Sequence, residues 1–232
     1  MKKFVLLFIL AVTAAGAQPA KKQLTLEDIW TSDKFTSRSL RDAAWLNGDS
    51  LFSYTDIDPA SQTRGVFLCS VPAGTKRLLI SAASLHTPGA DVPMSFSSYL
   101  WSPNGRSLLF VSAPPQNRYL SRLTPAGNYF LYDTTSRILK QLTNVDVPQY
   151  NHKFSPDGKT LGFVRGNNIY TIDLATGKET QITTDGSDVI LNGKSDWAYE
   201  EELDFSDAWK WSADGAQIVY WRSTSVVFRS IH

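Results

Sequence analysis

The chain has 232 residues with one cysteine and three histidines, and its 23 Lys and Arg nearly balance its 22 Asp and Glu. This length suits one large domain or part of a larger all-β domain. The balanced charge argues against a nucleic-acid partner, the single cysteine excludes an internal disulfide, and the widely separated histidines show no metal-ligand spacing. We therefore expect no nucleic-acid partner, no metal and no other cofactor.

The N-terminus has the pattern of a secretory signal peptide. Lys2 and Lys3 precede an apolar run from Phe4 to Val12, and the small residues 15–17 follow. This pattern predicts a signal peptide over residues 1–17. The apolar run is shorter than the roughly twenty residues of a membrane-spanning helix. We expect export to the periplasm or the extracellular space, with no membrane association beyond the signal peptide.

After a lead-in segment over residues 18–40, one sequence pattern recurs four times. Each copy has an aromatic or apolar residue, in most copies a serine with Pro or Ala after it, an Asn-Gly or Asp-Gly pair, and then an apolar strand. The copies lie at 44–54, 100–111, 153–164 and 210–221, at an interval of about 53 to 57 residues. The Asn-Gly and Asp-Gly pairs favour tight hairpin turns.

A second hairpin follows within two of the repeats, at 129–142 and 169–182. Two hairpins in each repeat make a four-stranded blade, so the predicted fold is an all-β, incomplete β-propeller of about four blades over residues 41–222. A sandwich of short strands is the alternative, and the long regular repeat argues against it.

An acidic run from Asp196 to Leu203 interrupts this β-rich pattern. Asp196 is a suitable N-cap, and Glu200 in the first turn complements the helix dipole, so a short helix is expected. Adjacent side chains on a helix are about 100° apart, so Glu201 and Glu202 can flank one cation while Glu200 points elsewhere. On a strand, Glu200 and Glu202 would share a face instead. A solvated helix turn without a ligand is the other interpretation.

Two aromatic residues, Trp197 and Tyr199, lie within the same run. We expect them to pack the short helix against its blade. A contact with a ligand is the other role open to them.

The run from Asp196 to Leu203 resembles the acidic motif of the dipeptidyl peptidase IV family of serine exopeptidases. In that family the motif lies on a short helix of a β-propeller and holds the N-terminal ammonium of the substrate. The resemblance implies that Glu201 and Glu202 bind the free N-terminus of a peptide. It also implies that Arg122 reaches the substrate carbonyl, with Arg118 as the nearby alternative.

The residues of a serine hydrolase centre are not visible in the chain. No Gly-x-Ser-x-Gly occurs, and His232 is the terminal residue. We expect a chain truncated before the catalytic domain, with no catalytic residues and no activity alone, and an aberrant tail over 223–232. An early stop, a frameshift or a partial sequence would each explain that tail.

For complete relatives the resemblance implies release of N-terminal dipeptides with Pro or Ala at the second position, and an ability to dimerise. Two other classes stay open. One is a stand-alone periplasmic propeller that binds peptides or a protein partner without catalysis. The other is a propeller like the partner of a peptidoglycan-associated lipoprotein, whose repeats are similar but which the acidic run would distinguish.

Overall fold

The computed structural model describes residues 23–35, 40–112 except 47, 49 and 88, and 127–224. The chain divides into two compact units, residues 1–39 and 40–232, which are described separately. The predicted signal peptide and most of the predicted tail lie outside the described residues. Among the described helices, none has the length and apolar character needed to cross a membrane.

In the N-terminal unit the structure describes one helix, α1 (Leu26–Trp30), and a 3-10 turn, η1 (Asp33–Phe35). Thr25 caps α1, because its side chain accepts a hydrogen bond from the backbone N–H of Asp28 while the Asp28 side chain accepts one from Thr25. This reciprocal pair satisfies two of the donors that a helix start leaves free. Lys34 forms an ion pair with Asp28.

The second unit is built almost entirely of short antiparallel strands. In chain order its elements are β1 (Arg41–Leu46), β2 (Leu51–Ile57), β3 (Arg64–Ser70), β4 (Thr75–Ser81), η2 (Ala82–Ser84), β5 (Phe96–Trp101), β6 (Ser107–Ser112), β7 (Tyr129–Asp133), β8 (Leu139–Gln141), β9 (Gln149–Phe154), β10 (Thr160–Arg165), β11 (Asn168–Asp173), β12 (Glu179–Gln181), β13 (Ile190–Asn192), α2 (Trp197–Leu203), β14 (Trp209–Trp211), β15 (Ile218–Tyr220) and β16 (Arg222–Thr224).

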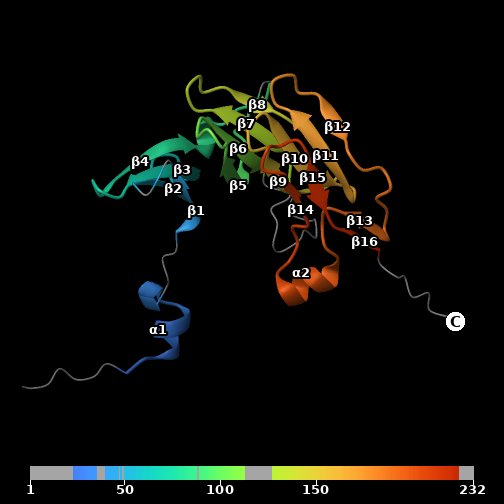
Figure 1. Cartoon of the computed structure of the whole chain (residues 1–232). Coiled ribbons are helices and arrows are strands. Elements are labelled where there is room, and N and C mark those ends of the chain that lie inside the picture. The colour runs from blue at the N-terminus through green and yellow to red at the C-terminus, as the bar shows by residue number, and fades with distance from the viewer. Residues whose placement is uncertain are drawn as a thin grey trace, which may run out of the picture. The chain divides into compact units, whose positions relative to one another are not determined.

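Three sheets have four strands each in simple meander order: blade 1 (β1–β4), blade 2 (β5–β8) and blade 3 (β9–β12). Two further pairs, β14–β15 and β13–β16, make up what we call blade 4. Figure 1 shows the sheets of blades 2 and 3 side by side. The predicted all-β β-propeller architecture is confirmed.

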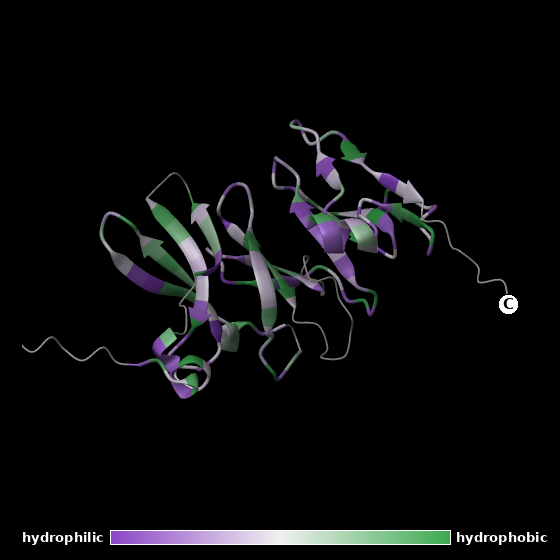
Figure 2. Cartoon of the chain, turned by 90° about the horizontal axis from the view of Figure 1, so that it is seen from below, coloured by the Kyte–Doolittle hydropathy of each residue, from purple (hydrophilic) through white to green (hydrophobic). Residues whose placement is uncertain are grey.

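The hydrophobic core lies between successive blades, and strand β6 shows why. Neighbouring side chains on a strand point to opposite faces, and the strands in Figure 2 are banded with hydrophobic and hydrophilic residues. Leu108 and Phe110 pack towards blade 1, while Leu109 and Val111 pack towards blade 3. A strand buried on both faces therefore reads as one continuous apolar run.

The repeated turns join β5 to β6 in blade 2, β9 to β10 in blade 3 and β14 to β15 in blade 4. In blade 3, Ser155 Oγ donates to Asp157 Oδ1 at 2.6 Å, and Gly158 adopts a φ of 72°. Gly158 faces the preceding turn: a methyl group added to it would lie 3.4 Å from Cδ of Pro103. The same contact recurs one blade later, where a methyl group on Gly215 would lie 3.3 Å from Cδ of Pro156. Successive turns thus stack proline on glycine.

Blade 4 differs because one extended segment, 218–224, pairs with two separate strands. Its first part, β15, pairs with β14, and its second part, β16, pairs with β13. The two parts are continuous, since Trp221 donates its N–H to Ala208 and accepts from the N–H of Gly193. The boundary predicted after residue 222 falls inside β16.

Candidate functional site

The acidic run forms a helix, α2, as its composition indicates. The side chain of Asp196 accepts a hydrogen bond from the N–H of Tyr199 at 3.2 Å, which is an N-cap. At the other end Asp204 has a φ of 50°, and its N–H bonds to the Tyr199 carbonyl. Aspartate tolerates this left-handed conformation, which ends the helix.

The three glutamates of α2 have different surroundings. Glu200 is half-buried, while Glu201 and Glu202 are exposed. Burial lowers the pKa of Lys194, and the charge of Glu200 opposes that effect, so Lys194 and Glu200 interact. The helix therefore turns Glu200 towards a cation of the protein and leaves the next two carboxylates facing solvent.

A short two-limbed segment carries α2. We call residues 193–195 and 206–208 the stem, because they flank the helix and pair with each other. Lys194 and Asp207 form an antiparallel bridge, and the N–H of Ala208 donates to the Gly193 carbonyl at 3.3 Å. The stem brings the two ends of the insertion together, so the helix is held at both ends.

The two aromatic residues of α2 differ in how far they pack the helix against its blade. Trp197 is 73% exposed. Tyr199 is 47% exposed, and its ring lies 6.4 Å from that of Phe205. The prediction is wrong for Trp197, because the stem attaches the helix and leaves the apolar side of α2 uncovered in the described chain.

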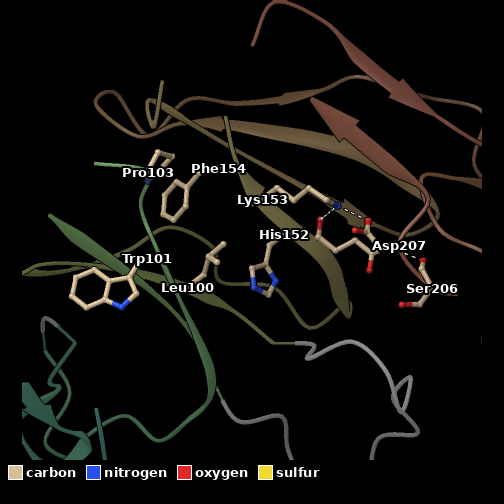
Figure 3. A pocket seen from close by; sticks show the side chains of 9 residues that line it. Leu100, Trp101, Pro103, His152, Lys153, Phe154, Ser206 and Asp207 are labelled. Atoms are coloured by element: carbon tan, nitrogen blue, oxygen red, sulfur yellow. Dashed lines mark hydrogen bonds and ion pairs between the residues drawn. The ribbon is translucent and has the colours of Figure 1, made fainter. Parts of the chain in front are cut away.

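A cavity of about 530 Å³ lies between the first strands of blades 2 and 3 and reaches the stem. Its lining residues are Leu100, Trp101, Pro103, Asn151, His152, Lys153, Phe154, Ser206 and Asp207. Figure 3 shows Lys153 reaching towards Asp207 across this space. The cavity thus has an apolar wall from β5 and a charged corner next to the stem.

Burial shapes the electrostatics of this corner. It lowers the pKa of Lys153, which the ion pair with Asp207 opposes, and the Lys153 ammonium lies 4.1 Å from the centre of the Trp209 ring. Burial, and secondarily the charge of Lys153, lowers the pKa of His152 to about 4. The imidazole of His152 is therefore neutral at pH 7.

Of the residues predicted to bind a substrate, Glu201 and Glu202 lie next to each other on α2, with both side chains exposed. Arg122 and its alternative Arg118 lie outside the described residues. Within the part of the chain that the structure describes, no group of three or more His, Cys, Asp or Glu side chains could hold a metal ion.

Sequence reasoning missed the residues of blade 3 that contact the stem. The side chain of Asn151 donates to the carbonyls of Gly193 and Ser206 at 3.1 and 2.9 Å. The ammonium of Lys194 lies 5.1 Å from the centre of the Tyr150 ring. The available signal was an asparagine within an otherwise strand-like segment, since asparagine tolerates a positive φ.

Comparison with known proteins finds similarity to one family. The family described as "Dipeptidyl peptidase IV (DPP IV) N-terminal region" matches residues 116–226. Dipeptidyl aminopeptidase B of Saccharomyces cerevisiae is 32% identical over 130 residues, which are 55% of this chain. Dipeptidyl peptidase 4 of Trichophyton equinum is 27% identical over 233 residues, or 95% of this chain. These matches assign the similarity of this chain to the N-terminal region of the dipeptidyl peptidase IV family.

The solved structures agree with this assignment. The crystal structure of Porphyromonas gingivalis dipeptidyl peptidase 4 matches 88% of this chain with a TM-score of 0.70 and 28% identity. The chain spans 28% of that protein, 15% of the yeast relative and 28% of the Trichophyton relative. It therefore covers less than a third of each of these dipeptidyl peptidases and corresponds to part of their propeller.

Proposed function

We propose that the acidic helix α2 binds the free N-terminal ammonium of a peptide through Glu201 and Glu202. The observation that carries this proposal is the placement of Glu201 and Glu202 next to each other on α2, with both side chains exposed. Glu200 is half-buried and interacts with Lys194.

The chemistry of the ligand follows from these two carboxylates. A peptide α-ammonium carries three donors in a compact head, and it is mostly charged at pH 7 because its ordinary pKa is about 7.7 to 8.0. Carboxylates accept such donors in charge-assisted hydrogen bonds, which are stronger than neutral ones. Arg122 is proposed as a second contact, to the carbonyl of the first peptide unit.

Similarity to the dipeptidyl peptidase IV family supports this role for the propeller. In a complete relative, holding the N-terminus at a fixed place would set the distance to the bond that is cut, and so the release of dipeptides. We propose the same task for this chain: substrate recognition within an exported peptidase of this family. The predicted signal peptide over residues 1–17 is the basis for export.

The test is a binding measurement, because recognition can be examined without catalysis. A short peptide with a free N-terminus and Pro at position two is titrated into the folded chain by calorimetry, beside the same peptide with an acetylated N-terminus. Hydrogen bonds to charged groups contribute roughly 1.5–3 kcal/mol. Acetylation, or the double change Glu201→Gln and Glu202→Gln, should therefore weaken binding about tenfold or more.

Glu200→Gln is the matched control, since it removes the same charge from the same helix at the position that faces Lys194. It should change the affinity much less than either neighbour. Equal binding of the free and acetylated peptides would show that α2 is not an ammonium site. An effect of Glu200→Gln as large as that of Glu202→Gln, with Glu201→Gln silent, would contradict the assignment of the two residues.

A further inference from the structure

The acidic helix is inserted into blade 4, but a residue of blade 3 holds it. That residue is Asn151, in the middle of β9, with a φ of 54°. Lys153 pairs with Gly162 and Tyr150 with Val164, so Asn151 and His152 together face one residue of β10. This two-against-one arrangement is a β-bulge, and a bulge redirects side chains away from their regular places.

The redirected side chain spans both limbs of the stem. Asn151 is 6% exposed, and its amide nitrogen donates to the Gly193 carbonyl at 3.1 Å and the Ser206 carbonyl at 2.9 Å. Gly193 precedes α2 in the chain and Ser206 follows it. An amide NH₂ has only two donors, and the Asn151 side chain uses one for a hydrogen bond to each limb of the stem.

Neighbouring contacts make the same connection between β9 and the stem. The indole N–H of Trp209, the first residue after the stem, donates to the Asn151 carbonyl at 2.9 Å. Lys153 forms an ion pair with Asp207 of the stem, and Lys194 of the stem lies over the ring of Tyr150. The stem is therefore fixed to β9 at several points, with Asn151 the one residue among these that bonds both limbs.

We propose that Asn151 is a positioning residue for the ammonium site on α2. The proposal rests on the proposed function of Glu201 and Glu202. By fixing both limbs of the stem, Asn151 sets the direction in which α2 leaves the propeller. That direction leaves the side chains of Glu201 and Glu202 exposed, where a peptide ammonium can reach them.

The experiment compares Asn151→Gly with Asn167→Gly in the full chain. Glycine accepts a positive φ, so each change removes side-chain hydrogen bonds and leaves the backbone conformation available. Asn167 is a matched control, since it lies in the same blade, has a φ of 64°, and donates its amide to the carbonyl of Ser187 at 2.8 Å, away from the stem.

Two measurements are made on each variant. The first is hydrogen exchange of the backbone amides of residues 193–208, followed by mass spectrometry. Asn151→Gly should speed exchange there about tenfold, because only the attachment of the stem to β9 is weakened. The exchange rates of the other segments of blade 3 should be unchanged. The second is the ratio of affinities for the free and acetylated peptides, which should fall towards one. Asn167→Gly should change neither.

Each outcome decides the proposal. Unchanged exchange over 193–208 in Asn151→Gly would overturn it. Faster exchange with an unchanged affinity ratio would also overturn the proposal, since the attachment of the stem to β9 would then have no effect on the ammonium site. If the parent chain itself binds both peptides equally, the proposed function fails, and the exchange measurement alone still decides whether Asn151 fixes the helix.

A second variant covers the case in which Asn151→Gly does not fold. Asn151→Asp keeps the size of the side chain and tolerates the positive φ, but it turns a carboxylate oxygen towards two carbonyl oxygens. The repulsion should loosen residues 193–208 and lower the affinity ratio at least as much as glycine does. Normal exchange and a normal ratio in this variant would overturn the proposal as well.

Discussion

At the residue scale, His152 places a titratable imidazole in the buried surroundings of β9. Its ring lies 5.2 Å from that of Tyr129, and its Nδ1 is buried with no hydrogen-bond partner among the described residues. Burial disfavours the charged imidazolium, which is why the pKa of His152 falls to about 4 from the ordinary 6.5.

The stability of the chain should therefore depend on pH between 7 and 5. The unfolded chain takes up the His152 proton near pH 6.5, while the folded chain takes it up only near pH 4. Stability is thus full above pH 6.5 and is lost as the pH falls towards 4. The expected loss between pH 7 and pH 5 is about 2 kcal/mol, measured as the free energy of unfolding in urea.

Replacing the histidine tests the source of this pH dependence. His152→Gln should remove most of the loss between pH 7 and pH 5, because no proton is then taken up at this position. His86→Gln is the control, since His86 is exposed, and it should leave the dependence unchanged. Identical pH profiles for the parent and His152→Gln would show that the buried imidazole has no such effect.

At this scale the sequence predicted the short helix that carries the glutamates, while the role of Glu201 and Glu202 stays a prediction. The structure adds that Glu200 interacts with Lys194. The asparagine at position 151 was a signal of a positive φ, but its contacts with the stem were not predictable, because they depend on a bulge in β9 and on carbonyls more than forty residues later in the chain. A contact between residues so far apart in the chain cannot be predicted from the local sequence.

At the scale of elements, blades 3 and 4 pack closely against each other at Gly162 of β10. A methyl group added there would lie 2.4 Å from Cη2 of Trp209 and 3.0 Å from Cζ2 of Trp211. Trp209 is 2% exposed, so its ring has no room to move. The glycine is required here by packing, since its φ is not positive.

Gly162→Ala should therefore destabilise the chain by about 1–3 kcal/mol, the usual cost of overpacking a core. The measurement is urea unfolding followed by tryptophan fluorescence. Gly65→Ala in β3 is the control, because the severest contact of its methyl group, at 2.8 Å, is with Cδ1 of Leu78, the end of a side chain that is 38% exposed, while the carbonyl oxygen of Ile80 lies farther away at 3.2 Å. That side chain can turn away, so an equal cost at both glycines would contradict the packing argument.

The elements themselves were largely readable from local patterns. The apolar run in β6 predicted a strand, and the N-cap Asp196 predicted the start of α2. The pattern could not predict that Leu108 packs towards blade 1 and Leu109 towards blade 3. It also could not predict that the stem would hold α2 and leave Trp197 exposed. Both facts depend on which elements lie next to one another after folding.

At the scale of the whole molecule, the segment of β15 and β16 in blade 4 exposes two large apolar side chains, Val219 and Trp221. Ile218 of β15 packs against the cluster formed by Val164, Ile169 and Trp209. Val219 points the opposite way, since side chains alternate along a strand, and it is 65% exposed. An exposed apolar strand face favours association with other molecules.

The purified chain should accordingly self-associate as its concentration rises, and Val219→Lys should weaken that association by placing a charge on the sheet. Sedimentation velocity over a range of concentrations measures the effect. Val92→Lys is the control, because Val92 is 75% exposed but lies outside the strands. A parent chain that stays monomeric, or equal effects of the two changes, would argue against association through blade 4.

The repeat interval predicted the blades because each blade is built from one local stretch of chain. Blade 4 departs from that rule. Its strands β13 and β16 are separated by α2 and the hairpin β14–β15, so their pairing is not visible in a repeat read along the sequence. The predicted end of the propeller at residue 222 therefore fell inside a strand.

The contacts between successive turns are directional, because each runs from the proline of one turn to the glycine of the next. The turns of blades 2 and 3 each offer a proline ring to the glycine of the next turn, Pro103 to Gly158 and Pro156 to Gly215. A duplicated unit would therefore find in place the proline ring that its own glycine contacts, and the existing units would not need to change. In the turn of blade 4 the proline position is held by Ala213. A further unit docking there would meet a single methyl group, and its tilt would have to be set by other contacts.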